Sequence, residues 1–370
     1  MSISIKDKKE ELLCRLTDFT KLKGGGCKVP QAELLSLLDG IGGGIGYDCS
    51  ISQTKFPDIV MIQTTDVSLK LFKNKNKLIK LYIYIYLIYI YIFFIIFLKK
   101  KFFFPLVDDP YFQGKIACAN VLSDLYSFGI EDCDNMLMLL ACSTDMTAEQ
   151  RQWSSKLMKQ GFNDQAICAG SKVSGGQTVK NPWPIVGGVA TSILKTNEFI
   201  KPVNAVPGDV LVLTNPLGTQ FCVNFHQWLS KPKRGEKINT ITNAKECEQV
   251  FNYATLSMAK LNRVGAKLMK NYNAHAATDV TGFGILGHST NLAQNQLLPI
   301  RFEIHTLPII KHMKKLEDHL NHPFKLLKGT SAETSGGLLI SMSRENAEAF
   351  CKEIYEIEKQ PAWIIGDVID

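Results

Sequence analysis

Short apolar runs alternate with amphipathic stretches along this chain of 370 residues. Apolar runs bounded by turn residues predict strands, and stretches with apolar residues three or four positions apart predict helices. Because strands and helices alternate in both halves, the pattern is typical of mixed α/β domains. The expected strands are residues 59–64, 135–140, 185–193, 210–214, 301–305 and 338–341, and the expected helices are 31–39, 111–128, 147–169 and about 245–271.

The length of the chain and one break in the pattern predict two domains. With 45% hydrophobic residues, the chain can bury two sizeable cores. A linker over residues 196–208 contains two prolines and separates the halves. We therefore expect a flexible glycine-rich arm at residues 1–28, an α/β domain at 29–195 and a second α/β domain at 207–370.

One segment near residue 80 differs from the rest of the chain. Residues 69–104 contain only Leu, Lys, Phe, Asn, Ile and Tyr, the amino acids that codons made solely of A and T specify. Tyr82–Tyr86 alternates as a TA repeat would encode it. Residues 67–68 can be read as GTA-AGT, which begins like a splice donor, and Lys101 can be AAG, which ends like an acceptor. We hypothesise that residues 67–101 are a retained intron read in frame.

A transmembrane helix is the alternative interpretation of this segment. Residues 81–98 are 18 consecutive apolar positions flanked by lysines, which is long enough to span a bilayer. A single span would place Asp48 and Asp66 on one side of the membrane and Asp124 and Asp279 on the other. If these four residues share a site, a span is excluded, and we favour the intron hypothesis.

The charge and the cysteines exclude some classes of protein. The formal charge of +7 falls to −1 when the eight lysines of residues 67–101 are left out, so there is no electrostatic case for nucleic acid. The ten cysteines form no C-x-x-C pair and have no zinc spacing. Residues 1–10 are polar and show no secretory signal. Reduced thiols in the cytoplasm are the expectation.

Acidic residues beside glycine loops, strand ends and helix faces are the first candidates for chemistry. Magnesium takes hard oxygen ligands, usually a few carboxylates together with substrate phosphates. Each carboxylate could instead be a helix cap or a turn residue. Asn120 and Asp124 lie four residues apart and share one face of the expected helix. The candidate carboxylates are Asp48, Asp66, Asp108, Asp109, Asp124 and Asp279.

Glycine-rich segments are candidates for phosphate binding. No Walker A motif occurs, and Gly282–Gly287 matches G-x-G-x-x-G only weakly, deep in the chain and without a clear preceding strand. Gly175-Gly176-Gln177-Thr178 and Thr334–Gly337 offer backbone N–H groups and hydroxyls, although both could be plain turns. Lys28 could close over a phosphate or be an ordinary surface lysine, and Cys27 could be a nucleophile or inert.

Eight motifs, taken together and in order, resemble selenophosphate synthetase, in particular its animal type. The resemblance covers about residues 16–368 apart from the inserted segment. The motifs are Gly24–Pro30, Gln63–Asp66, Pro105–Tyr111, Ala117–Tyr126, Ser174–Thr178, Pro207–Thr214, Ala274–His288 and Thr330–Gly337.

The resemblance implies a fold and an activity. The family has the two-domain α/β fold of aminoimidazole ribonucleotide synthetase and pairs as a homodimer through strands of the N-terminal domain. It converts ATP, selenide and water to selenophosphate, AMP and phosphate, and selenophosphate is the selenium donor for selenocysteine synthesis.

Roles for individual residues also come from the resemblance. Asp48, Asp124 and Asp279 look like ligands of Mg²⁺, and Lys28 matches the essential lysine of the glycine-rich arm. Phosphoryl transfer depends mostly on positioning and charge neutralisation, which such residues supply. The residues that resemble ATP contacts are Lys28, Gly46, Tyr47, Asp48, Asp66, Asp124, Gly175, Gly176, Gln177 and Thr178.

One departure from the family bears on activity. Gly25 stands where active members carry cysteine or selenocysteine, and glycine has no side chain that could handle selenide. Neighbouring Cys27 is a weak substitute. The alternative to an active enzyme is therefore a nucleotide-binding paralogue with a regulatory role and no selenide activity.

The family pattern also agrees with the intron hypothesis. Members have three residues between the Gln-Thr-Thr-Asp and Pro-x-Val-Asp-Asp-Pro motifs. Joining Asp66 to Phe102 leaves three phenylalanines there, Phe102–Phe104.

Overall fold

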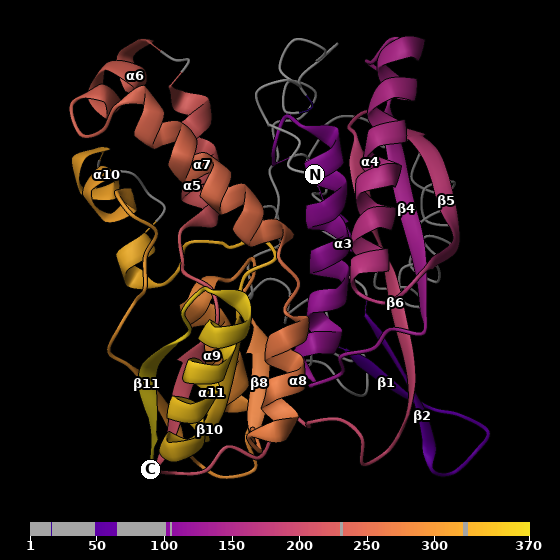
Figure 1. Ribbon diagram of the computed structural model, residues 1–370, viewed down its shortest axis with the longest axis vertical. Coiled ribbons are helices and arrows are strands. Elements are labelled where there is room, and N and C mark those ends of the chain that lie inside the picture. Colours follow the sequence, from indigo (N-terminus) through magenta and orange to yellow (C-terminus); the bar gives the residue numbers. More distant parts are fainter. Residues whose placement is uncertain (1–15, 17–48, 65–100, 104–105, 230–231, 321–324) are drawn as a thin grey trace, which may run out of the picture.

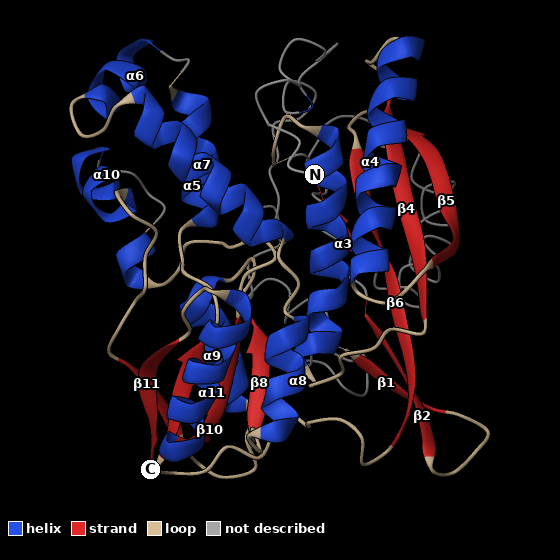
Figure 2. Ribbon diagram, in the orientation of Figure 1, coloured by secondary structure: helices blue, strands red, loops and turns tan. Residues whose placement is uncertain are grey.

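The computed structural model describes residues 16, 49–64, 101–103, 106–229, 232–320 and 325–370. Within these residues, two β-sheets lie side by side and each is packed against helices, as Figure 1 and Figure 2 show. The expected mixed α/β architecture is therefore confirmed, and the structure shows that it contains two sheets.

The first sheet and its helices lie between residues 50 and 195. They are β1 (Ser50–Gln53), β2 (Ile59–Thr64), β3 (Lys101–Phe103), α3 (Pro110–Ser127), β4 (Asn135–Ser143), α4 (Ala148–Cys168), β5 (Val173–Asn181) and β6 (Ile185–Lys195).

The strand order of this sheet is β1-β2-β6-β4-β5, and β3 also pairs with β6. Strands β4 and β5 are parallel and are joined through α4, while the other pairs are antiparallel. Helices α3 and α4 pack against each other and against the same side of the sheet (Figure 2).

Helix α3 is the central element of the molecule. It begins where the Asp109 carboxylate accepts hydrogen bonds from the N–H groups of Tyr111 and Phe112, with Pro110 in the first turn. Most of its residues are buried. It packs closely on α4: the backbones approach so near that a Cβ added to Gly161 of α4 would overlap the Tyr111 carbonyl oxygen of α3. Only glycine permits this approach between the two helices.

The second sheet and its helices lie between residues 209 and 369. They are β7 (Asp209–Leu213), α5 (Thr219–Trp228), α6 (Pro232–Asn239), α7 (Ala244–Ala259), α8 (Arg263–Asn271), β8 (Ala276–Asp279), α9 (Gly284–Gln294), β9 (Arg301–Ile304), α10 (Met313–Leu320), the 3₁₀ turn η4 (Leu326–Lys328), β10 (Leu338–Ser343), α11 (Arg344–Glu358) and β11 (Trp363–Ile369).

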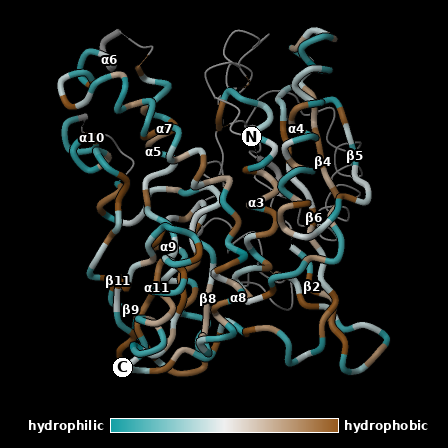
Figure 3. Tube along the Cα trace, viewed as in Figure 1, coloured by the Kyte–Doolittle hydropathy of each residue, from teal (hydrophilic) through white to brown (hydrophobic). Residues whose placement is uncertain are grey.

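This sheet is antiparallel, in the order β8-β10-β7-β11-β9, and its strands β7, β8 and β10 are buried on both faces. Along β7, Val210 and Val212 belong to one hydrophobic cluster, and Leu211 and Leu213 belong to another. A strand buried on both sides reads as a continuous apolar run, as residues 210–213 do. Figure 3 shows that the outer helices α6 and α10 are mainly hydrophilic.

Helix α3 joins the two halves. It packs on β2 and β6 of the first sheet and also on α7, α8 and β8 of the second half (Figure 1). One hydrophobic cluster contains Val121 of α3 together with Val210 and Leu338 of the second sheet. A hydrogen bond of 2.6 Å from Gln165 Nε2 to the Ala259 carbonyl oxygen also crosses the boundary. The two sheets therefore share one continuous core.

The structure corrects some expected elements. The single helix expected at about 245–271 is two helices, α7 and α8, separated at residues 260–262. The sequence did not predict the strands β1, β3, β5, β8 and β11 or the helices α5, α6, α9, α10 and α11. The expected helix at 31–39 lies outside the described residues.

The apolar segment at residues 81–98 lies outside the described residues as well. In the part of the chain that the structure describes, no helix is long and apolar enough to cross a membrane.

Candidate functional site

Two predicted acidic residues from opposite halves of the chain lie on elements in contact with each other. Asp124 lies on α3, the helix expected at residues 111–128, and is only 5% exposed. Asp279 is the last residue of β8 and is 1% exposed. Because α3 packs against β8, the fold brings both carboxylates to the boundary between the halves.

The expected loop at residues 330–337 lies at this boundary. The Asn120 Oδ1 atom on α3 accepts a hydrogen bond of 2.8 Å from the backbone N–H of Ser335. On the other side, the N–H of Val280 donates a hydrogen bond of 2.9 Å to the Gly337 carbonyl oxygen. Asn120 of α3 and Val280, which follows Asp279, therefore both bind the loop at residues 330–337.

The loop needs its small residues. Ser335 has a φ of +46°, in the left-handed region that costs energy for a residue other than glycine. A Cβ on Gly336 would overlap the Val280 carbonyl oxygen, and a Cβ on Gly337 would overlap the Asn215 nitrogen. The two glycines let this loop approach the residue that follows β8 and, on the other side, Asn215 just after β7, which explains the Gly-Gly pair physically.

Asn262 is a buried connection that the sequence did not reveal. Its Nδ2 atom donates hydrogen bonds to Ser123 Oγ at 3.1 Å and to the Gly336 carbonyl oxygen at 2.8 Å. It therefore ties α3 to the loop from the break between α7 and α8. No glycine or proline marks that break, so the sequence carried no signal for it.

Asp279 fits a role as a cation ligand. Its Oδ2 atom is buried and has no hydrogen-bond partner among the described residues. A buried carboxylate oxygen without a partner is costly unless a cation or a donor completes it. Ser335 Oγ and Asn262 Oδ1 are likewise buried without a partner in the described part of the chain. Carboxylate, hydroxyl and amide oxygens are the kind of ligand that Mg²⁺ prefers.

Several predicted site residues lie outside the described residues, so the structure tests neither their positions nor the complete set of metal ligands. Within the described ranges, no three His, Cys, Asp or Glu residues are grouped as a metal site would require. The predicted trio includes a residue beyond those ranges. The undescribed site residues are Gly25, Cys27, Lys28, Gly46, Tyr47, Asp48 and Asp66.

The run Gly175-Gly176-Gln177-Thr178 is a strand and not the loop or turn that we expected. It forms the middle of β5, the edge strand that pairs in parallel with β4. Backbone pairing is tight at Gly176, where an added Cβ would overlap the Met138 carbonyl oxygen. Most of β5 is exposed. The sequence did not indicate a strand here, because the run has too few apolar residues to show the alternation that is typical of strands.

Two other expectations concern the acidic residues and the weak glycine motif. Asp109 is the N-cap of α3, so its alternative interpretation as a cap is confirmed. Residues 282–287 do follow a strand, β8, and lead into α9, which corrects the expectation that no strand precedes them. A dinucleotide fold is still excluded, because β8 pairs antiparallel with β10.

Glu333 is a buried acid in the same loop. Its carboxylate accepts hydrogen bonds from the backbone N–H groups of Gly218, at 2.6 Å, and Thr219, at 2.9 Å, and from the Thr219 hydroxyl. It therefore satisfies the N-terminus of α5, where negative charge is favoured. Burial raises the pKa of Glu333 to about 7, and these hydrogen bonds oppose the rise.

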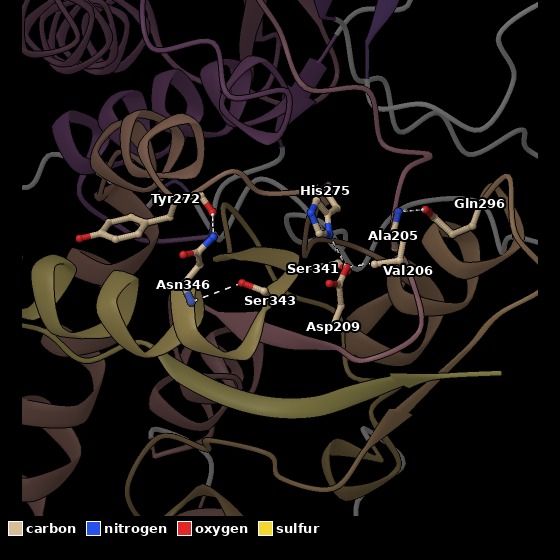
Figure 4. A network of polar contacts seen from close by, with 9 residues as sticks. All are labelled: Ala205, Val206, Asp209, Tyr272, His275, Gln296, Ser341, Ser343 and Asn346. Carbon is tan, nitrogen blue, oxygen red and sulfur yellow. Dashed lines mark hydrogen bonds and ion pairs between the residues drawn. The ribbon is translucent and has the colours of Figure 1, made fainter.

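His275 lies at the other end of β8 and is held in a separate network (Figure 4). Its Nδ1 atom lies 2.7 Å from Asp209 Oδ2, and the same oxygen accepts hydrogen bonds from Ser341 Oγ at 2.7 Å and the Val206 N–H at 3.2 Å. Ser341 bonds the carboxylate and not the imidazole, so the three are not arranged as a nucleophilic triad. The network fastens the ends of β7, β8 and β10.

One hollow lies away from this boundary. It has a volume of about 590 Å³ and is lined by eight residues between His305 and Lys315 together with Leu327. Neither Asp124 nor Asp279 contributes to it.

Models of two protein domains match the chain. Residues 95–194 match the N-terminal domain of AIR synthase related protein, and residues 206–370 match its C-terminal domain. Solved structures agree in fold. Thiamine monophosphate kinase from *Aquifex aeolicus* has a TM-score of 0.59 at 17% identity and covers 92% of this chain and 96% of its own. HypE in a HypE–HypF complex has a TM-score of 0.58 at 14% identity, covering 92% and 93%.

Sequence relatives are much more similar. A selenide, water dikinase of *Dictyostelium discoideum* is 88% identical over 370 residues, which cover all of this chain and 92% of the relative. Human selenide, water dikinase 2 is 45% identical, with 96% of this chain and 80% of the relative covered. These matches, together with the two AIR synthase related domains, show that the chain belongs to the selenide, water dikinase family, also called selenophosphate synthetase.

Proposed function

We propose that this chain is a selenide, water dikinase that uses ATP, selenide and water to make selenophosphate, AMP and phosphate for selenocysteine synthesis. The observation that carries the proposal is the full-length similarity to proteins of that name, one of them 88% identical. The buried boundary between α3 and β8 supports it, because Asp279 there has a carboxylate oxygen with no partner among the described residues, and such an oxygen can bind a metal ion.

In the proposed site, Asp48, Asp124 and Asp279 hold Mg²⁺, whose charge would offset that of the ATP phosphates. Asn120 and Asn262 position the loop at residues 330–337 beside them. Fixed carboxylates and a preformed loop lower the cost of organising the site when the nucleotide binds.

Further residues complete the proposed ATP site. Lys28 places a positive charge on the phosphates from the glycine-rich arm. The remaining contacts proposed for ATP are Gly46, Tyr47, Asp66, Gly175, Gly176, Gln177 and Thr178.

We also propose that the protein is a cytoplasmic homodimer in which the first sheets of two copies pack against each other. On the side of this sheet away from α3 and α4, Leu137 is 38% exposed, Val179 is 47% exposed and Ile193 is 56% exposed. The strand register places them on one face: Leu137 lies opposite Val189, four residues from Ile193, and Val179 lies opposite Ala141, four residues from Leu137. No described helix covers this face. Exposed apolar side chains on one sheet face support pairing with a second copy.

Gly25 supports the second candidate, a nucleotide-binding paralogue without selenide activity. The names of the relatives favour the enzyme. A selenide-dependent AMP assay tests the choice, applied to the 370-residue chain and to the chain without residues 67–101. AMP formed from Mg·ATP only when selenide is present is the expected result. Mg·ATP binding without selenide-dependent AMP would reject the enzyme and leave the paralogue.

A further inference from the structure

Strands β2 and β3 lie end to end along the same edge of β6, although 36 residues separate them in the chain. Residues 59–64 of β2 pair with residues 195–190 of β6, and residues 101–103 of β3 pair with residues 188–186. Both pairings are antiparallel. Only Val189 lies between the two paired stretches of β6.

If residues 67–101 are removed, β2 and β3 can join into one strand that pairs with β6 without a gap or a bulge. Thr64 lies opposite Ala190, and each further step along the strand moves one step back along β6. Residue 66 would therefore lie opposite Gly188, and the residue joined to it would lie opposite Gly187. Phe102 is the residue that lies opposite Gly187 in the structure. Removing residues 67–101 joins Asp66 to Phe102 in this register.

The position opposite Gly188 is therefore filled by a different residue in each of the two chains, with and without residues 67–101. In the 370-residue chain, Lys101 lies opposite Gly188. In a chain without residues 67–101, Asp66 would take that position. The length of the segment inferred from codons and splice signals and the length required by the strand register are the same, 35 residues, although the two arguments use independent observations.

Sheet periodicity makes this agreement specific. Side chains alternate between the two faces of a sheet, so an error of one residue moves every following side chain to the opposite face. Removing 34 or 36 residues would shift Phe102 and Phe103 relative to β6, or would force a bulge beside Gly188. Only a deletion of 35 residues preserves both pairings, and the segment with the ends inferred from codons and splice signals has this length.

The chain that follows β3 is firmly anchored, which fixes where the restored strand must end. The N–H of Leu106 donates a hydrogen bond of 2.8 Å to Gln113 Oε1 of α3. Asp109 then caps the same helix. The position of β3 is therefore tied to α3, the helix that carries Asp124.

We propose that residues 67–101 interrupt a single strand and that the functional protein is the chain without them, with residues 59–66 and 102–103 forming one continuous strand beside β6. The inference rests on the described strands on both sides of the segment. It does not depend on the proposed activity. It assigns Asp66 a position opposite Gly188, within the same sheet that supports α3.

Three deletion variants test the proposal against the parent chain. The first lacks residues 67–101, and the matched controls lack residues 67–100 and 67–102. We expect the first to unfold cooperatively and at the highest temperature, to be the most soluble, and to show the largest rise in unfolding temperature with Mg·ATP. A parent chain or a control that equals it in unfolding temperature would overturn the proposal.

Sequencing the transcript across the codons of Asp66 and Phe102 gives a second test that needs no folded protein. Messages that join these codons directly are expected, and messages that all retain the segment would overturn the proposal. The activity is tested separately. If the chain without residues 67–101 folds best but makes no AMP with selenide, the strand assignment stands and the proposed function fails.

Discussion

Replacing Asn262 with alanine removes two hydrogen bonds that fasten α3 to the second half of the molecule. The Nδ2 donor lies 3.1 Å from Ser123 Oγ and 2.8 Å from the Gly336 carbonyl oxygen, and the residue is 4% exposed. Each hydrogen bond contributes about 1 kcal/mol net, and a buried carbonyl left without a partner costs about 1–3 kcal/mol more. We expect Asn262→Ala to lower the free energy of unfolding by at least about 3 kcal/mol.

Thermal unfolding followed by circular dichroism measures this loss. With a shift of about 2–4 °C per kcal/mol for a domain of this size, the expected fall in unfolding temperature is roughly 6–12 °C. Asn262→Asp should be at least as destabilising, because a carboxylate cannot donate to the Gly336 carbonyl oxygen.

Asn346 provides the matched control. Its Nδ2 atom also donates to a carbonyl oxygen, that of Tyr272, at 3.0 Å (Figure 4), but both residues lie in the second half and the bond is only partly buried. Asn346→Ala should cost about 1 kcal/mol and leave the Mg·ATP affinity unchanged. If Asn262→Ala loses no more stability than Asn346→Ala, then Asn262 does not hold the halves together as inferred.

Two other changes probe the packing and the buried acid. Gly161→Ala should destabilise the protein by about 1–3 kcal/mol in urea unfolding, because the added Cβ overlaps the Tyr111 carbonyl oxygen and separates α3 from α4; unchanged stability would refute this close contact. Because burial raises the pKa of Glu333 to about 7, the folded state keeps a proton that the unfolded state releases. Stability should therefore fall by about 3 kcal/mol as the pH rises from about 4.5 to 7, and Glu333→Gln should remove this part of the slope. An identical slope in both proteins would contradict the assignment.

The helix and strand pattern predicted the parts of the fold that are buried most regularly. Helix α3 was found because apolar residues fill it and Gly129 follows its end, and the structure adds that Asp109 caps its start. Strand β7 was found because both of its faces are buried, which makes it a continuous apolar run.

Other elements carried too little local signal. Strand β5 contains Ser-Gly-Gly-Gln-Thr and is mostly exposed, so it resembles a loop in sequence. Strand β8 has only four residues. The break between α7 and α8 depends on Asn262, whose partners lie 139 and 74 residues away in the chain. Contacts over such distances leave no periodicity in a sequence.

In the candidate site too, some residues could be predicted from the sequence and others only from the structure. The motifs indicated Asp124 and Asp279, and the fold places them on contacting elements. The roles of Asn262 and of the left-handed Ser335 arise only when α3, the loop and β8 pack together. The register of β2 and β3 along β6 also required the structure, although the ends of the inserted segment were visible in the sequence.

A double-mutant cycle on Asp124 and Asp279 tests the central claim most directly, namely that the two carboxylates serve one metal–nucleotide site. Mg·ATP affinity would be measured by calorimetry for Asp124→Asn, Asp279→Asn and the double variant, in the chain without residues 67–101. Each single change should weaken binding at least tenfold, or about 1.4 kcal/mol. The account predicts that the two losses are not additive and differ from their sum by at least about 1 kcal/mol. Strictly additive losses, or affinities equal to that of the parent, would contradict it.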